Sequence, residues 1–163
     1  MFGCCTHQAT LSVRSMSARR LRGACDGGFP KEAAFQHLFH EAMAQHLRPG
    51  SLIIPELNTK AVVDGGKVVS GELDFYVDGE LQWALELLRN GDRFKEHKER
   101  FHPWSGKYRN VKTKAFLIVD CRGPLKREAK REEDRCTLYF SENFQRCTCA
   151  MRNQPLIELS LQD

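Results

Sequence analysis

The stretch GELDFYVDGELQWALELLRNG, residues 71–91, decides the fold. It reads as two apolar strands joined near Asp78–Gly79, with Asp74 in the first strand and Glu86 in the second. Side chains in a strand alternate between its two faces, so each strand has one apolar face and one face that carries acid. The first apolar face is expected to hold Leu73, Phe75 and Val77.

The length of the connecting loop decides how these strands pair. A two-residue turn would pair Val77 with Glu80 and put the apolar face of one strand on the same side as the acids of the other. A five-residue loop, residues 78–82, instead pairs Val77 with Trp83. We therefore predict the five-residue loop, because it keeps the apolar faces together.

This register places Asp74 directly opposite Glu86, with their Cβ atoms about 5 Å apart. Two carboxylates at that distance repel and resist desolvation, so the pairing is costly unless a cation lies between them. Oxygen ligands from two or three acids, completed by water and phosphate, suit Mg²⁺ or Mn²⁺ better than zinc. The alternative is a solvent-facing strand with ordinary surface acids.

The composition predicts one domain without a membrane-spanning segment. The chain has 163 residues, 41% of them apolar and 28% charged, and no apolar run approaches the roughly 18 residues that a membrane helix needs. The net charge of +4 is mild, but residues 86–114 hold nine Lys or Arg against four acids. This local excess favours an anionic partner more than the net charge does.

Seven cysteines, an odd number without a CxxC pair, favour reduced thiols over a disulfide framework or a zinc site. We therefore expect an intracellular, reducing location, in the nucleus or cytoplasm. Residues 1–27 form a basic leader, either disordered or similar to an organellar transit peptide. Residues 28–163 are expected to form a single domain, with a core at 30–122 and a strand-rich extension at 123–163.

The remaining elements follow from periodicity and from capping residues. Helices are expected at 30–47, beginning at Pro30, and at 93–101, capped by Asp92. The charged segment PLKREAKREEDR, residues 124–135, predicts a solvated helix or a linker. Further strands are expected at 51–57, 115–120, 137–140, 148–151 and 156–161.

Together these elements and motifs resemble the restriction-endonuclease-like PD-(D/E)xK nuclease fold, and most closely the nuclease-like C-terminal domains of Crinkler-type effectors. The resemblance implies an α/β fold with an α-β-β-β-α-β core, a mixed central sheet and a small strand-rich C-terminal extension. It rests on these motifs: ELDFYV with Asp74, WALELLRNG with Glu86, EH at 96–97, RF at 100–101, GKY at 106–108 and VDCR at 119–122.

By this resemblance Asp74 and Glu86 are the Mg²⁺ or Mn²⁺ ligands, and Glu32 is a third acid at the start of the first helix. Glu32 is equally well explained as a favourable acid in a first helical turn. The motif places Lys two residues after the Glu, where this chain has Leu88. Lys95, or Lys107 in the basic loop, is a candidate replacement.

His97 is expected to point toward the sheet, either as a catalytic group or as an ordinary core histidine. The basic, aromatic loop that follows is suited to phosphate and base contacts, although an ordinary solvated loop is the alternative. The expected nucleic-acid contacts are Arg93, Arg100, Lys107, Tyr108 and Arg109.

The sequence thus predicts a metal-dependent nuclease-like domain that hydrolyses phosphodiester bonds, with DNA preferred. The absence of the motif lysine keeps a second hypothesis open, a catalytically impaired effector module that binds nucleic acid. A third hypothesis is a protein-interaction module that uses the charged segment 126–135. Kinship with effectors also implies delivery to a host cell, and no membrane partner is expected.

Overall fold

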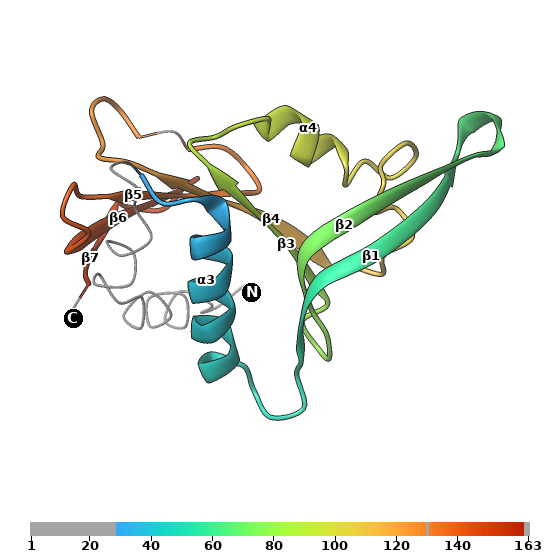
Figure 1. The fold of residues 1–163 in the computed structure, drawn as a ribbon, viewed down its shortest axis with the longest axis horizontal. Helices are drawn as coiled ribbons and strands as arrows, with labels where there is room; N and C mark the ends of the chain where they lie inside the picture. The colour runs from blue at the N-terminus through green and yellow to red at the C-terminus, as the bar shows by residue number, and fades with distance from the viewer. Residues whose placement is uncertain (1–28, 130, 162–163) are drawn as a thin grey trace.

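The computed structural model describes residues 29–129 and 131–161, which form a mixed α/β structure around one seven-stranded sheet (Figure 1). The leader at 1–27 lies outside the described residues. Neither α3 nor α4, the α-helices of the described chain, has the length and apolar character that crossing a bilayer requires. The elements are α3 (Glu32–His46), β1 (Ile53–Val63), η2 (Asp64–Gly66), β2 (Lys67–Val77), β3 (Trp83–Arg89), α4 (Phe94–Glu99), β4 (Ala115–Arg122), β5 (Arg135–Phe140), β6 (Arg146–Met151) and β7 (Ile157–Ser160).

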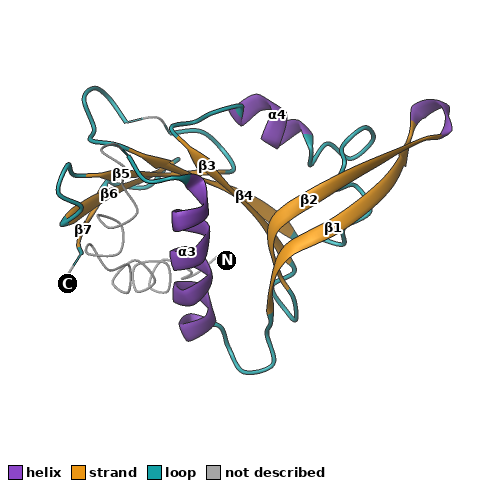
Figure 2. Cartoon of the chain, viewed as in Figure 1, coloured by secondary structure: helices purple, strands orange, loops and turns teal. Residues whose placement is uncertain are grey.

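The strands lie in sequence order across the sheet, from β1 to β7. Strands β3, β4 and β5 are parallel, and the pairs on either side of them are antiparallel. The three C-terminal strands therefore continue the central sheet, whereas the sequence suggested a separate small extension. The secondary structure is coloured in Figure 2.

Helix α3 covers one face of the sheet with a stripe of apolar residues. Phe35 and Leu38 of α3 pack against Phe75, Leu85 and Leu87 in the main core. Burying side chains of this size contributes about 1.5–3 kcal/mol each. This core fixes α3, and with it the acid and amide groups of the first helical turns, over β2 and β3.

Alternation along β3 turns Ala84, Glu86 and Leu88 to the opposite face, on which α4 and its following loop lie. A second apolar cluster forms there from Leu73, Ala84 and Tyr108, with Phe101 and other aromatic side chains packed against it. Leu73 was expected beside Phe75 and Val77, and this prediction was wrong. The change of cluster coincides with a local distortion between β1 and β2, described next.

The predicted register is confirmed where Val77 pairs with Trp83, but the predicted pairing of Asp74 with Glu86 is not part of the ladder. The β2–β3 ladder covers three residue pairs and ends at Phe75–Leu85, whereas β1 and β2 continue together as a long hairpin, the β1–β2 arm. Next to this fork, Glu56 of β1 has a φ of 51°, and the β1–β2 pairing skips it. The ladder also omits Asp74, the residue opposite Glu56, so the regular pairing is interrupted at the point where Leu73 and Phe75 pack into different clusters.

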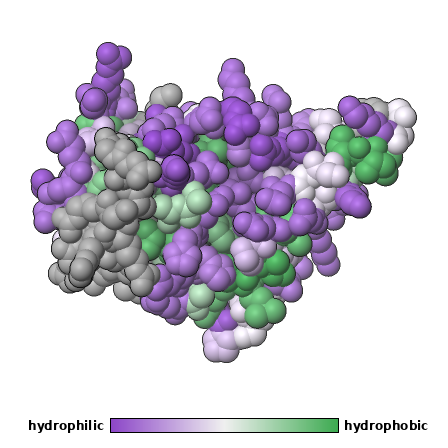
Figure 3. Space-filling model, viewed as in Figure 1, coloured by the Kyte–Doolittle hydropathy of each residue, from purple (hydrophilic) through white to green (hydrophobic). Residues whose placement is uncertain are grey.

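The β1–β2 arm extends beyond the rest of the sheet, and its end carries exposed apolar residues (Figures 1 and 3). Val62 and Val68, paired across the arm, are 50% and 61% exposed. The arm is braced near its middle by the loop after α4. Thr59 Oγ1 lies 3.3 Å from the Lys107 carbonyl, and Asn110 Nδ2 donates to the Lys60 carbonyl at 3.0 Å.

Element boundaries differ from the sequence predictions in instructive ways. Strand β1 runs to Val63, well past the predicted end at residue 57. The N-cap of α4 is Arg93, with a φ of 49°, rather than Asp92. Helix α3 begins two residues after Pro30. The charged segment before β5 contains no helix among its described residues.

Candidate functional site

Glu86 is the centre of a buried polar cluster on the α4 face of the sheet. Its side chain is fully buried. One carboxylate oxygen lies 2.5 Å from the Tyr108 hydroxyl, and the other accepts from His97 Nδ1 at 2.5 Å and from Arg100 Nη1 at 3.0 Å. The guanidinium compensates the buried charge, which would otherwise be costly to remove from water.

Helix α4 and the loop after it deliver these three partners. His97 and Arg100 are one helical turn apart, so both side chains reach the same face of β3. Tyr108 follows Gly106, which packs so closely that a Cβ there would lie 2.3 Å from the Arg100 carbonyl oxygen. The Tyr108 hydroxyl also lies 2.5 Å from the carbonyl oxygen of Glu72, which ties the loop to β2. Burial and the Glu86 charge raise the pKa of Tyr108, so the hydroxyl stays protonated as a donor.

Asp74 lies at the fork between β2 and β3, where its side chain, in place of a backbone carbonyl of β2, accepts a hydrogen bond from β3. Its Oδ2 accepts from the Leu87 N–H at 2.6 Å, and its Oδ1 accepts from Gln36 Nε2 at 3.2 Å. Burial, and secondarily the negative charge of Glu86, raises the pKa of Asp74 to about 7. The Leu87 hydrogen bond opposes this shift but is outweighed.

Glu32 joins the same electrostatic neighbourhood from the first turn of α3. Burial raises the pKa of Glu32, the positive field of His97 lowers it, and repulsion by Glu86 raises it again. Repulsion by Glu86 thus reaches both Glu32 and Asp74, and Glu32 in turn adds to the repulsion at Asp74.

The acids around Glu86 do not form a good site for a divalent ion. Among the residues that the structure describes, no three His, Cys, Asp or Glu side chains are grouped so that they could hold a metal ion. Glu86 already accepts three hydrogen bonds, one from a guanidinium whose charge repels a second cation. The arrangement therefore does not fit Mg²⁺ or Mn²⁺, and metal binding stays a prediction.

Leu88, which occupies the position of the motif lysine, is buried and lies opposite Asp120 of β4. Lys95, the candidate replacement for the motif lysine, is exposed and lines a pocket next to α4. Of the predicted catalytic residues on α4, His97 is the one that the structure brings to Glu86. The motif position itself holds the apolar side chain of Leu88, and the positive charge near Glu86 comes from Arg100.

Asp120 forms a second buried carboxylate cluster that the sequence analysis did not identify as a site. Its oxygens accept from Arg122 Nε at 2.5 Å, from Arg135 and from the Gly91 N–H at 2.6 Å. An acid at the end of the apolar run AFLIVD could have signalled this cluster. It links β4, β5 and the turn before α4, and so supports the element that carries His97.

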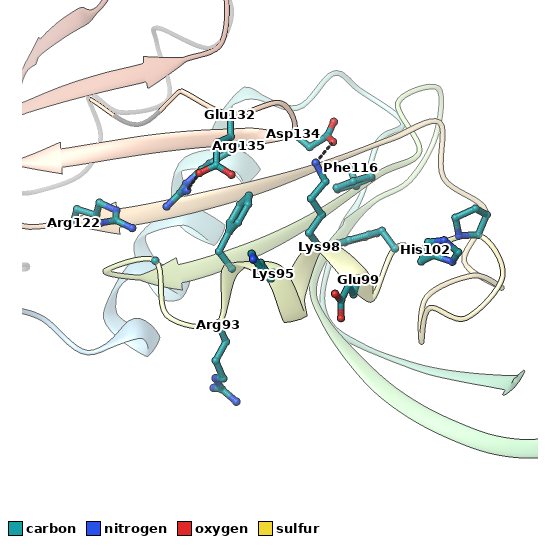
Figure 4. Close-up of a pocket in the computed structure, with 14 residues that line it drawn as sticks. Arg93, Lys95, Lys98, Glu99, His102, Phe116, Arg122, Glu132, Asp134 and Arg135 are labelled. Atoms are coloured by element: carbon teal, nitrogen blue, oxygen red, sulfur yellow. Dashed lines mark hydrogen bonds and ion pairs between the residues drawn. The ribbon is translucent and has the colours of Figure 1, made fainter. Parts of the chain in front are cut away.

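Near this second cluster lies a pocket of about 950 Å³. It extends from Gly91 and Phe94 to Arg122 and Arg135, and Lys98 bridges its rim by an ion pair to Asp134 at 3.3 Å (Figure 4). The guanidinium of Arg135 stacks over Phe94, 4.3 Å from the ring centroid. The cations deep in this pocket are thus already paired within the protein.

The predicted nucleic-acid contacts divide into two groups. Arg93 and Lys107 are exposed, and Arg109, half-buried, donates to the Trp104 carbonyl at 2.5 Å. Tyr108 is 3% exposed and used inside the protein, and the Arg100 side chain is 17% exposed and paired with Glu86 and Glu96. As the structure stands, these last two side chains are not accessible for the nucleic-acid contacts that the sequence analysis predicts. Trp104, 75% exposed, is the aromatic group that this loop offers to solvent.

No protein-family model, curated protein or solved structure matches this chain. The nuclease resemblance therefore rests on the residues of the chain itself.

Proposed function

We propose that this domain binds nucleic acid through the basic return segment, residues 93–114, on a nuclease-like architecture whose central acid is used to hold the fold. The observation that carries the proposal is the contrast between Glu86 and Trp104. Glu86 is fully buried and satisfied by protein groups, whereas Trp104 is 75% exposed in a segment rich in cations.

The path of the chain distributes these cations along the molecule. Because β3 and β4 are parallel, the segment between them must run back along the length of β3, which spans about 23 Å. Within it lie eight Lys or Arg and two acids. Six of the basic residues are exposed: Arg93, Lys95, Lys98, Lys107, Lys112 and Lys114. Of these, Lys98 forms an ion pair with Asp134.

This distribution suits a phosphate backbone better than a compact anion. Cations spread over such a length can contact several phosphates, and each contact releases counterions from the nucleic acid. An exposed indole adds a surface on which a base can stack, contributing about 1–3 kcal/mol. The proposal therefore favours unpaired or locally opened strands over a purely duplex ligand.

The test is fluorescence anisotropy with labelled single-stranded and duplex oligonucleotides at several salt concentrations. We expect log K to fall with log salt with a slope of about −4 to −5. Lys95→Ala/Lys107→Ala should reduce this slope by about 2, and Trp104→Ala should weaken single-strand binding roughly 5- to 100-fold. Lys126→Ala/Arg127→Ala removes the same charge elsewhere and should leave binding unchanged. Affinity that is absent, or independent of salt, contradicts the proposal.

Metal-dependent hydrolysis of nucleic acid, the expectation from the resemblance, is the second candidate. One observation favours it: burial and repulsion by Glu86 raise the pKa values of Asp74 and Glu32, a conflict that a cation would relieve. Plasmid nicking in Mg²⁺ or Mn²⁺ tests this candidate, with Asp74→Asn as the reference. Nicking no faster than that of the Asn variant rejects it and leaves the binding proposal standing.

A further inference from the structure

Two cysteines face each other across neighbouring strands far from the acidic cluster. Cys136 of β5 and Cys149 of β6 have their Sγ atoms 3.5 Å apart. Cys149 pairs with Leu138 in the ladder, so the two cysteines are diagonal neighbours on the same face of the sheet. Cys136 is half-buried, and Cys149 is 9% exposed.

The short contact makes the two thiols unequal. Their hydrogen bond raises the pKa of Cys136, as does burial, and the same hydrogen bond lowers the pKa of Cys149 against the effect of burial. One sulfur therefore holds the proton while the other gains thiolate character. The thiolate is the form of cysteine that reacts with oxidants.

The other described cysteines lack this arrangement. Cys121 and Cys147 are 1% exposed, and burial raises the pKa of each thiol. They therefore stay protonated within the apolar core and behave as small apolar groups. The pair Cys136–Cys149 is distinguished by sulfur contact and by greater access, not by the cysteine content alone.

We propose that Cys136 and Cys149 form a peroxide-sensitive dithiol that closes to a disulfide. The Cys149 thiolate attacks one oxygen of hydrogen peroxide, the O–O bond breaks, and sulfenic acid and hydroxide result. The Cys136 thiol then attacks the sulfenic sulfur, an S–S bond forms, the S–O bond breaks, and the departing oxygen takes up the thiol proton as water. In total two thiols are oxidised, and one peroxide is reduced to two waters.

The surrounding structure is compatible with this closure. A disulfide requires the sulfurs to approach to about 2.05 Å, and rotations of two side chains on paired strands can supply most of that movement. The bond would close a loop from residue 136 to residue 149, the hairpin of β5 and β6. A closed loop of this size restricts the unfolded chain, so we expect the melting temperature to rise by about 5 °C or more.

The experiment maps the bond in the full-length protein after exposure to hydrogen peroxide and alkylation of the remaining thiols. Trypsin cuts after Arg135, Arg146 and Arg152, which places Cys136 alone in residues 136–146 and both Cys147 and Cys149 in residues 147–152. We expect these two peptides to be linked, with tandem mass spectrometry assigning the link to Cys149. Cys4, Cys5 and Cys25, in the same digest, report general oxidation.

Three variants separate the proposed pair from its neighbours. Cys147→Ala should keep the link, and Cys149→Ala should abolish it. Cys136→Ser should accumulate sulfenic acid that dimedone traps on Cys149. Full alkylation of Cys136 and Cys149 at peroxide levels that oxidise the other cysteines would overturn the proposal. A disulfide to Cys147 in the wild-type protein would also overturn the proposal. This result needs no variant, so it does not depend on whether a variant folds.

Discussion

Glu86 illustrates how the position of a residue can be predicted while its partners are not. Its position on β3 followed from the strand pattern, and its use as a metal ligand stays a prediction. The partners that satisfy it, Arg100 and Tyr108, were predicted as surface contacts. Sequence spacing did not show that the loop after α4 folds back onto the sheet, because that depends on the tight packing around Gly106.

Neutralising Glu86 should destabilise the protein strongly. Glu86→Gln leaves His97 and Arg100 facing an amide in a buried site, and breaking a buried ion pair in this way costs about 3–5 kcal/mol. Urea unfolding measures the effect. Glu96→Gln removes the exposed partner of the same arginine and should leave the unfolding midpoint almost unchanged, because solvent screens that pair. Equal stability of the two variants would contradict the structural role given to Glu86.

Asp74 should make stability depend on pH in the direction opposite to that of an ordinary paired carboxylate. Its folded pKa of about 7 lies above its reference value of 3.8, so the unfolded chain releases the proton first as pH rises. The folded state is therefore penalised progressively between pH 4 and pH 7, and the penalty is constant above that range. Its size is at most about 4 kcal/mol.

Asp74→Asn isolates this contribution, because the amide oxygen can still accept the Leu87 hydrogen bond. Unfolding free energies of the variant and of the wild type should diverge in favour of the variant from pH 4 to pH 7. Curves that stay parallel over this range would show that Asp74 is not the group responsible.

Among the elements, α4 and its loop depend on one glycine more than on helical propensity. Helix α4 has six residues and no side-chain cap at its start, so packing must hold it. At Gly106 an added Cβ would lie 2.3 Å and 2.6 Å from two backbone carbonyl oxygens. Gly106→Ala should therefore displace Tyr108 and lower the melting temperature by several degrees.

Gly123→Ala is the matched control, because an added Cβ there meets nothing closer than 3.9 Å. Its melting temperature should stay within about 2 °C of the wild type. A similar loss for both glycine variants would show that close packing at Gly106 does not hold the loop.

For the whole molecule, the sequence was informative where local rules decide the structure. Whether the loop between Val77 and Trp83 has an odd or an even number of residues is a local property. The pairing of Val77 with Trp83 that was derived from it is confirmed. Leu73 was misplaced because strict alternation assumes an uninterrupted ladder, and the interruption at Glu56 and Asp74 left no recognisable mark in the sequence. The C-terminal strands were found, but periodicity cannot show which sheet a strand joins.

The candidate site was predictable only in part. Asp74 and Glu86 were placed by alternation and register, Glu32 was added from the resemblance, and their common role as a site stays a prediction. The clustering of Arg122 and Arg135 around Asp120 brings together residues from different strands and a turn. Such clusters depend on tertiary packing, so no window of the sequence contains them.

The fork between β2 and β3 has a consequence for the motions of the protein. Beyond the fork the β1–β2 arm contains seven ladder pairs of its own, whereas β2 joins β3 through three pairs. A hairpin with strong internal pairing and a short attachment can detach as a unit without the rest of the sheet unfolding. Amide protons of the arm should then share one opening free energy, smaller than that of β4 and β5, which would make the arm a distinct cooperative unit in hydrogen exchange.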